Sequence, residues 1–246
     1  MNILSIGLLL ILIPAISMGF ISWKSILILA LVYSVTLGWG VFDIGSQFFM
    51  KTYWRGELGK VSFTFDDGPH PIITQQILQV LKEENVKATF FCIGKNAGKY
   101  PEIVRQIVAE GHVVGNHTYK HDYVFSKAAA EKQIVDGAQA IQKIIGKKPV
   151  YFRPPFGVMT PEIAKAAKKA NCAIIGWDLR SQDGNIRTTK ATINRVKAHL
   201  KKSTLLLFHD TNPTTPEALR EIIHLCRKNG MEIVSLSSMC GIDPYD

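Results

Sequence analysis

Charge is nearly absent from the start of this 246-residue chain. Residues 1–23 and 25–42 contain no charged side chain and are mostly apolar, and only Lys24 separates them. Each stretch is long enough to cross the hydrocarbon core of a membrane as a helix. The first stretch has no basic residue before it and no small-x-small site after it, which argues against a cleaved signal peptide. We therefore expect residues 1–50 to be a membrane-anchoring region with two spans, about 3–23 and 25–42; a signal sequence followed by one anchor is the alternative.

Three further absences argue against whole classes of protein. None of the four cysteines stands in a CxxC pair, and Cys92 and Cys172 border apolar runs. We expect these thiols to be buried, and nothing in their spacing requires an oxidising compartment. No GxGxxG follows the first predicted strand, which argues against a dinucleotide-binding sheet. No basic helix or aromatic-basic RNA motif is present, so we expect no nucleic-acid partner.

The charge that the chain does carry is mostly of one sign. Lysine and arginine together number 29 against 20 acidic residues, a formal charge of +9, and nearly all of them follow the apolar region. Such an excess favours an anionic partner, such as a phospholipid surface, a lipid-linked phosphosugar or a wall polymer. A generally basic solvent-exposed face explains it equally well.

From residue 60 onward, short apolar runs alternate with longer amphipathic stretches. The apolar runs predict strands at 61–65, 88–92, 112–115, 150–152, 173–177, 204–208 and 232–236. The amphipathic stretches predict helices at 72–84, 101–110, 126–145, 160–170, 188–201 and 216–228. We expect one α/β domain over residues 60–246, joined to the membrane region by a linker at 51–59.

Alternation of strand and helix predicts a parallel sheet with helices outside it, as a doubly wound sheet or a closed barrel. Polar residues follow several of the predicted strands: Asp66, Asp67, Asn116, His117, Arg153, Asp178, His209 and Asp210. In a barrel all strand C-terminal ends meet at one mouth, where active sites lie. This distribution favours the barrel.

The run TFDDGP at residues 64–69 places two carboxylates at the end of the first strand. The glycine and proline that follow break the pleat, so Asp66 and Asp67 can both reach the mouth. Two adjacent aspartates are unfavourable unless a cation or basic group lies between them. One can then bind a metal while the other acts as a base.

The run HTYKH places two imidazoles four residues apart, at His117 and His121. On a helical turn they would face the same way and could share one metal ion. Two histidines and one aspartate leave positions open for water and substrate, as a catalytic metal site requires.

The run RPPFG follows the fourth strand. An arginine beside a carboxylate keeps it ionised and oriented, which is the interpretation we give to Arg153. The rigid Pro-Pro segment could direct the backbone N–H of Phe156 towards a developing oxyanion. Taken alone, this motif is more typical of a structural turn.

The apolar strand LLLF ends in a histidine, His209, which suits a general acid that protonates a leaving amine. Asp183 could hold this imidazole and raise its pKa, and Asp178 is a competing candidate for the same role. A histidine after an apolar run is more often structural.

Together these motifs resemble the polysaccharide deacetylase family, the NodB-homology domain of carbohydrate esterase family four. The similarity covers most of residues 60–236, with five motifs in order. By this resemblance Asp66 is the base, and Asp67, His117 and His121 are the metal ligands. Arg153 orients the base.

The fourth and fifth motifs of the family fall on Asp183 and on residues 205–209, so that His209 is the acid. The resemblance implies a distorted (β/α)7 barrel that binds one divalent metal, usually zinc, with Co2+, Ni2+ or Mn2+ as alternatives. One departure is clear: Gly184 stands where the family commonly has tryptophan, which removes part of a groove wall.

The implied activity is metal-dependent hydrolysis of an N-acyl group, expected to be N-acetyl, on an amino sugar. The N-acylated saccharide would belong to a glycan, a wall polymer or a lipid-linked sugar. A membrane-associated metal phosphoesterase and a catalytically silent carbohydrate-binding relative are the alternatives.

We expect the chain to lie in a bacterial cell membrane, in contact with its lipids. Lys51, Arg55 and Lys60 follow the second span and favour a cytoplasmic side weakly.

Overall fold

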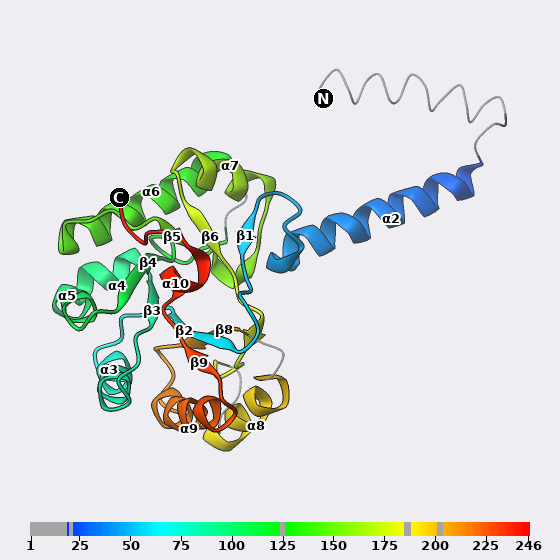
Figure 1. The fold of residues 1–246 in the computed structure, drawn as a ribbon. Helices are drawn as coiled ribbons and strands as arrows, with labels where there is room; N and C mark the ends of the chain where they lie inside the picture. Colours follow the sequence, from blue (N-terminus) through cyan, green and yellow to red (C-terminus); the bar gives the residue numbers. More distant parts are fainter. Residues whose placement is uncertain (1–18, 20–21, 124–125, 185–187, 201–203) are drawn as a thin grey trace.

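The computed structural model describes residues 19, 22–123, 126–184, 188–200 and 204–246. Its first described helix, α2 (Trp23–Phe42), projects away from the remainder of the chain (Figure 1). Among the described residues, α2 alone is long and apolar enough to cross a membrane, and 6% of its apolar window is buried. The predicted span at 25–42 coincides with α2, whereas the span at 3–23 lies almost wholly outside the described residues.

Nine parallel strands form one curled sheet. They are β1 (Thr52–Tyr53), β2 (Lys60–Asp66), β3 (Thr89–Cys92), β4 (Val113–Asn116), β5 (Tyr151–Phe152), β6 (Ala173–Ile175), β7 (Leu179–Arg180), β8 (Leu205–His209) and β9 (Glu232–Ile233). The spatial order is β1-β6-β5-β4-β3-β2-β8-β7, with β9 beside β2. In the described part of the chain the end strands β1 and β7 do not pair. The expected distorted (β/α)7 barrel is therefore confirmed, as a barrel left open on one side.

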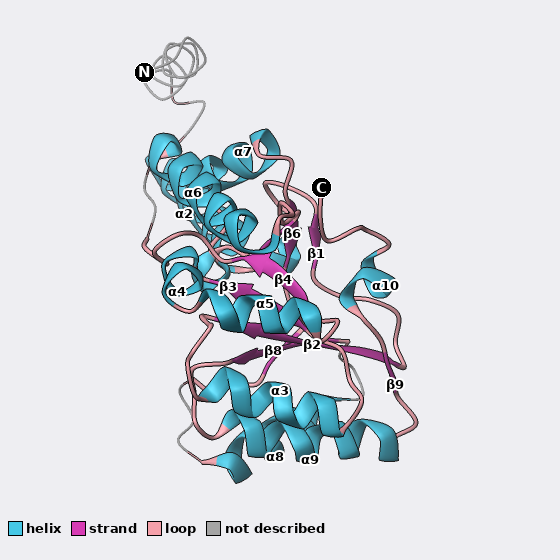
Figure 2. Ribbon diagram, turned by 90° about the vertical axis from the view of Figure 1, so that its left-hand side faces the viewer, coloured by secondary structure: helices cyan, strands magenta, loops and turns pink. Residues whose placement is uncertain are grey.

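Helices cover the outer face of this sheet. They are α3 (Ile73–Glu83), α4 (Gly94–Lys99), α5 (Pro101–Ala109), α6 (Lys127–Ile145), α7 (Pro161–Lys169), α8 (Thr189–His199), α9 (Thr215–Lys228) and α10 (Leu236–Cys240). Figure 2 shows α3, α8 and α9 along one side of the sheet and α6 and α7 along the other. Caps fix some of the ends: the Ser126 hydroxyl accepts from the third residue of α6, and Gly146 closes this helix with φ 74°.

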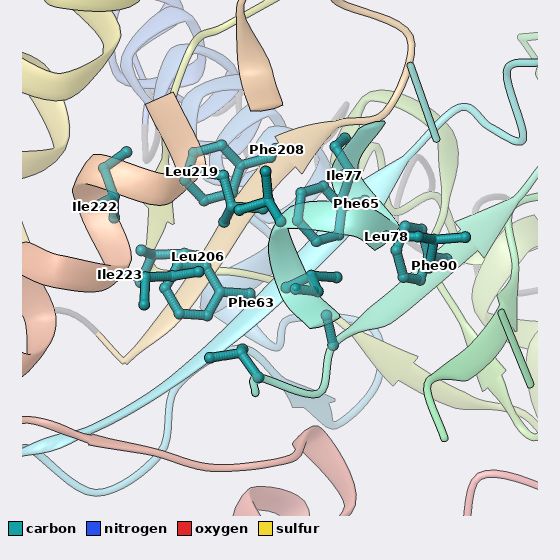
Figure 3. Packing of buried hydrophobic residues seen from close by; sticks show 14 of the residues in the cluster. Phe63, Phe65, Ile77, Leu78, Phe90, Leu206, Phe208, Leu219, Ile222 and Ile223 are labelled. Carbon is teal, nitrogen blue, oxygen red and sulfur yellow. The ribbon is translucent and has the colours of Figure 1, made fainter. Parts of the chain in front are cut away.

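The main hydrophobic core lies between the central strands and α3 and α9 (Figure 3). Phe63 and Phe65 of β2 and Phe208 of β8 are completely buried. The ring of Phe65 stacks on that of Phe90, with centroids 4.9 Å apart. Full burial of each such side chain contributes roughly 1.5–3 kcal/mol to the stability of the folded chain. This packing fixes β2 and β8, the two strands that carry Asp66 and His209, against each other.

The structure differs from the sequence-based expectation at four short elements. The predicted linker at 51–59 contains β1, which pairs with β6 at the edge of the sheet. The predicted strand at 232–236 ends at Ile233, because the Ser235 hydroxyl accepts from the Ser238 amide and starts α10. The strand β7 and the one-and-a-half-turn helix α4 were not predicted, since neither is long enough to show a periodicity.

All four cysteines are free thiols, as their spacing suggested. Cys92, Cys172 and Cys226 are buried and Cys240 is partly buried. Burial raises the pKa of the Cys172 and Cys226 thiols to about 11 and about 12. They are therefore inert packing residues at neutral pH.

Candidate active site

The register of the parallel strands brings the predicted site residues to one edge of the sheet. Asp66, the last residue of β2, lies opposite His209, the last residue of β8. On the other side, Asn116 of β4 pairs with Phe152 of β5, so His117 and Arg153 leave the sheet next to each other. Parallel strands end on the same side of a sheet, and this is why residues far apart in sequence meet here.

Asp67, His117 and His121 form a compact set of candidate metal ligands. The Asp67 Oδ1 atom lies 3.5 Å from His117 Nε2 and 3.3 Å from His121 Nε2, and the three ligand atoms lie within 4.8 Å of one another. Oδ1 is buried without a hydrogen-bond partner. A cation between the three atoms would satisfy it, and two imidazole nitrogens with one carboxylate oxygen suit Zn2+. The residues present therefore fit a divalent metal ion.

The pKa shifts of Asp67 and His121 favour the deprotonated forms that bind a metal, whereas the shift of His117 does not. Burial alone raises the pKa of the Asp67 carboxyl, but the adjacent His117 imidazole, 3.5 Å away, and the charge of His121 lower it to about 2. Burial and the neighbouring His117 lower the pKa of His121. For His117 burial acts in the same direction, but the charges of Asp66 and Asp67 outweigh it and raise the pKa. His117 Nδ1 bonds the Arg153 carbonyl at 2.7 Å, which leaves Nε2 to face Asp67.

The prediction that His117 and His121 share a helical turn is wrong. Residues 117–123 are a loop, in which Thr118 has φ 65° and His121 has φ 62°. The first turn of α4 fixes this loop, because the amides of Gly94 and Lys95 donate to the carbonyls of Thr118 and Tyr119 at 2.8 and 2.9 Å. The two imidazoles thus converge through left-handed backbone instead of helical periodicity, a kind of strain that clusters at functional sites.

Arg153 is completely buried and joins the sheet to Asp66. Its Nη1 donates to Asp66 Oδ1 at 2.7 Å and to Thr64 Oγ1 at 2.8 Å. Its other nitrogens donate to the carbonyls of Ile175 and Gly176. The expected pairing of Arg153 with Asp66 is present, and the guanidinium fixes the orientation of this carboxylate.

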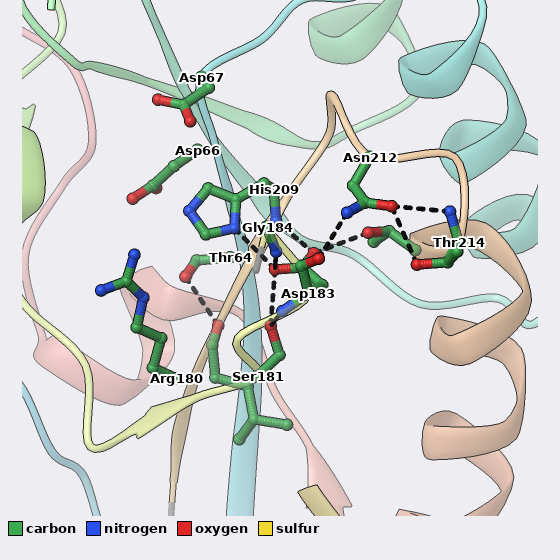
Figure 4. A network of polar contacts seen from close by, with 12 residues as sticks. Thr64, Asp66, Asp67, Arg180, Ser181, Asp183, Gly184, His209, Asn212 and Thr214 are labelled. Carbon is green, nitrogen blue, oxygen red and sulfur yellow. Dashed lines mark hydrogen bonds and ion pairs between the residues drawn. The ribbon is translucent and has the colours of Figure 1, made fainter. Parts of the chain in front are cut away.

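His209 is held by Asp183, as expected. Its Nδ1 lies 2.6 Å from Asp183 Oδ1, and its backbone amide donates to Oδ2 at 2.8 Å (Figure 4). Burial alone lowers the pKa of His209, but the hydrogen bond and charge of Asp183 outweigh it and raise the pKa. The hydroxyls of Ser181 and Thr215 also donate to Asp183, which is completely buried.

The competing candidate, Asp178, does not contact His209 in the structure. Its carboxylate pairs with Arg55 at 3.0 Å and accepts from the amides of Thr204 and Leu205. It therefore ties the segment between β1 and β2 to the start of β8.

Phe156 lies beside the loop of residues 117–123. Its backbone is left-handed, with φ 60° and ψ 3°, within the short helix η2 (Pro155–Gly157). Its ring contacts that of His121 at a centroid distance of 4.6 Å and stacks on Tyr123 at 4.4 Å. The expected role of its N–H in binding an oxyanion stays a prediction.

A cavity of about 90 Å3 unites these groups at the mouth of the barrel. Its lining comprises Asp66, Asp67, His117, His121, Phe156, Trp177, Arg180, Leu207 and His209. The sequence had not singled out Trp177, Arg180 or Leu207 as site residues. Arg180 belongs to the unpredicted strand β7, and its buried Nε has no hydrogen-bond partner. A strand assignment for residues 179–180 would have placed it at the mouth.

Gly184 lies beside the imidazole of His209, which lines this cavity. A Cβ at this position would lie 3.5 Å from His209 Nδ1, an ordinary contact distance. The glycine is therefore not required by crowding with the imidazole.

Comparisons with known proteins agree with this geometry. The family described as polysaccharide deacetylase matches residues 56–175. A peptidoglycan-N-acetylglucosamine deacetylase of Bacillus cereus is 36% identical over 186 residues, which span 73% of this chain and 68% of that protein. A chitooligosaccharide deacetylase of Azorhizobium caulinodans is 32% identical over 165 residues, 66% of this chain and 79% of that protein.

Solved structures show the same similarity in three dimensions. The crystal structure of the Bc1960 peptidoglycan N-acetylglucosamine deacetylase has a TM-score of 0.75 and 32% sequence identity to this chain, and the match covers 79% of this chain and 95% of that chain. The open parallel barrel and these relatives together identify the chain as a hydrolase of the deacetylase class. The chain belongs to the polysaccharide deacetylase family and is a polysaccharide N-deacetylase.

Proposed function

We propose that this chain is a membrane-anchored, metal-dependent enzyme that hydrolyses the N-acetyl group of an amino sugar. The observation that carries the proposal is the small cavity in which Asp66 and His209 meet the Asp67, His117 and His121 set. The relatives named as deacetylases of N-acetylglucosamine and of chitooligosaccharides support an N-acetylated saccharide as the substrate.

Asp67, His117 and His121 would hold the metal, with zinc as the first choice and cobalt, nickel or manganese as alternatives. When bound, such an ion supplies Lewis-acid polarisation of the amide carbonyl and increases the acidity of a water molecule. The described residues contain one cluster of three such ligands. A two-metal phosphoesterase needs more ligands than this cluster offers.

Asp66 is positioned to act as the base. Its carboxylate takes a proton from the attacking water while the water oxygen forms a bond to the acetyl carbonyl carbon. Arg153, 2.7 Å away, keeps the carboxylate in place through this transfer. The N–H of Phe156 would donate to the carbonyl oxygen as negative charge develops there.

His209 is positioned to act as the acid. Since Nδ1 faces Asp183, the proton that leaves comes from Nε2. It moves to the amide nitrogen as the C–N bond breaks, which releases acetate and the free amino sugar. The pKa of His209, raised by Asp183, keeps the imidazole protonated to a higher pH and so available as an acid.

The helix α2 would anchor this active site at a bacterial cell membrane. Its length and composition permit a span, and its apolar side chains are exposed in the structure. The bacterial deacetylases among the relatives act on cell-wall peptidoglycan by their names, which agrees with an enzyme held at the cell surface or at the membrane where wall precursors are made.

Acetate release by the purified full-length chain tests the proposal. We expect acetate from an oligosaccharide of N-acetylglucosamine, loss of this activity after treatment with a chelator, and recovery after addition of Zn2+. The variant His117→Gln should bind less metal and lose activity, whereas His224→Gln, on an exposed face, should do neither. Activity that survives complete metal removal, or no acetate from any N-acetylated saccharide, would contradict it.

A further inference from the structure

A second cavity, of about 350 Å3, lies next to the active site and is almost entirely apolar. Its lining comprises Val41, Phe42, Thr118, Asp122, Tyr123, Ala130, Gln133, Ile134, Phe152, Pro155, Phe156, Val158, Thr160 and Ile163. The volume falls in the range of about 300–1,000 Å3 that is typical of small-molecule sites. A cavity with an apolar lining binds a hydrocarbon chain more favourably than a hydrated sugar.

One wall of this apolar cavity is the end of the membrane helix. Val41 and Phe42 are the last two residues of α2. The Val41 carbonyl accepts a hydrogen bond from the Met159 amide at 2.9 Å, which ties the helix end to the domain. If α2 spans a bilayer, its end marks the membrane surface, so the cavity lies at the depth where lipid chains begin.

Another part of the lining of the cavity belongs to the active site. Phe156 lines both cavities, and its ring also contacts His121. Thr118, in the loop that carries the two metal-ligand histidines, lines the apolar cavity as well. A chain bound in the cavity would therefore have its head group beside the reacting atoms.

We infer that the apolar cavity takes the hydrocarbon chain of a lipid-linked amino sugar, whose acetamido group enters the metal-ligand site. This inference rests on the proposed function and narrows it from N-acetylated saccharides in general to those carried on a membrane lipid. The excess of basic residues, which gives the chain a formal charge of +9, agrees with a substrate that has an anionic link between sugar and lipid.

The chain-length dependence of activity measures this binding. The probes are the methyl, butyl and octyl glycosides of N-acetylglucosamine, given to the full-length protein in phospholipid nanodiscs. Each methylene that enters an apolar site strengthens binding about fourfold. We expect KM to fall steeply from the methyl to the octyl glycoside while kcat stays within about twofold, because the chain binds away from the reacting bond.

Two variants separate the cavity from general partition into the bilayer. Ala130→Phe fills the cavity from α6, and Phe42→Ser removes an apolar rim residue that is 75% exposed, so folding does not depend on it. Both should raise KM for the octyl glycoside and leave the methyl glycoside unchanged. Ala128→Phe, on the exposed face of α6, is the matched control and should keep the chain-length dependence.

An octyl glycoside with a photoreactive group at the chain end gives an independent readout. Labelling of peptides from α6 and α7, reduced in Phe42→Ser, is the expected result. A KM that does not change with chain length, or one that changes equally in all variants, would overturn the inference. Failure to release acetate from the methyl glycoside as well as from oligosaccharides would instead overturn the proposed function.

Discussion

The two sides of the catalytic cavity are built with opposite charges. On one side the buried cation Arg153 holds the carboxylate of Asp66 at 2.7 Å. On the other side the buried anion Asp183 holds the imidazole of His209 at 2.6 Å. Arg153 and Asp183 are completely inaccessible, whereas the groups that they hold line the cavity. Each of the two proposed reacting groups is thus fixed by a buried ion of opposite sign. The Arg153–Asp66 pair suits a base that accepts a proton, and the Asp183–His209 pair suits an acid that donates one.

The two buried ions are anchored differently. Arg153 is part of the sheet, since it donates to backbone carbonyls of residues 175 and 176 and its guanidinium lies 4.1 Å from the centre of the Phe91 ring. Asp183 is part of a loop, in which it accepts from the Gly184 amide and from the Thr215 hydroxyl at the start of α9. We therefore expect changes on the Arg153 side to affect both folding and rate, and changes on the Asp183 side to affect mainly rate.

The largest expected effect is on the base. Asp66→Asn keeps the shape of the side chain but cannot accept a proton, so kcat should fall about a thousandfold. Bound metal should stay at the wild-type level, because Asp67, His117 and His121 are unchanged. Metal analysis and acetate release, measured on the same preparation, check both statements. Asp136→Asn, in a surface ion pair, is the control, and near wild-type turnover of Asp66→Asn would exclude Asp66 as the base.

The next effect is on stability. Arg153→Met removes the buried cation and leaves Asp66 buried without its partner, which should lower the free energy of unfolding by about 3–5 kcal/mol. Urea unfolding of the detergent-solubilised chain measures this change. Arg105→Met, on the exposed face of α5, should stay within about 0.5 kcal/mol of wild type. Equal stability of the two variants would show that the Arg153 side is not part of the structural core.

The acid should have a smaller and more selective effect. His209→Gln cannot protonate the leaving amine, so acetate release from an N-acetylated oligosaccharide should fall about a hundredfold. An aryl acetate ester, whose leaving group needs no proton, should be hydrolysed at a rate close to that of wild type. If both substrates lose activity equally, His209 supports the structure of the site and does not act as an acid.

Much of this arrangement could be predicted from the sequence, because parallel strands end at one mouth. The runs that follow β2, β4, β5 and β8 predict that Asp66, His117, Arg153 and His209 lie together, and the strand register agrees. The pairing of Asp183 with His209 was also expected, although Asp178 competed for it. The two aspartates are distinguished by the residues that they bind in the structure and not by their positions in the sequence: Asp183 binds His209, whereas Asp178 binds Arg55.

The local backbone could not be predicted. The histidine pair at spacing four indicated a helical turn, but Thr118 and His121 are left-handed, and the loop is bonded to the amides of α4. Short elements such as β7 and α4 carry no periodicity, so the sequence does not predict that Arg180 lies at the mouth of the barrel. The apolar cavity also depends on how the end of α2 meets α6 and α7, a long-range contact that no local pattern encodes.

The pH dependence of kcat/KM for wild type and Asp183→Asn tests the division into base side and acid side most directly. Loss of the Asp183 charge should lower the pKa of His209, so the decline of activity with rising pH should begin at a lower pH than in wild type. The rise of kcat/KM on the acidic side of the pH profile should not shift. In Asp178→Asn the decline on the alkaline side should stay at the wild-type pH. The account would be contradicted if the alkaline decline of kcat/KM were unchanged in Asp183→Asn, or if the acidic and alkaline sides of the profile shifted together.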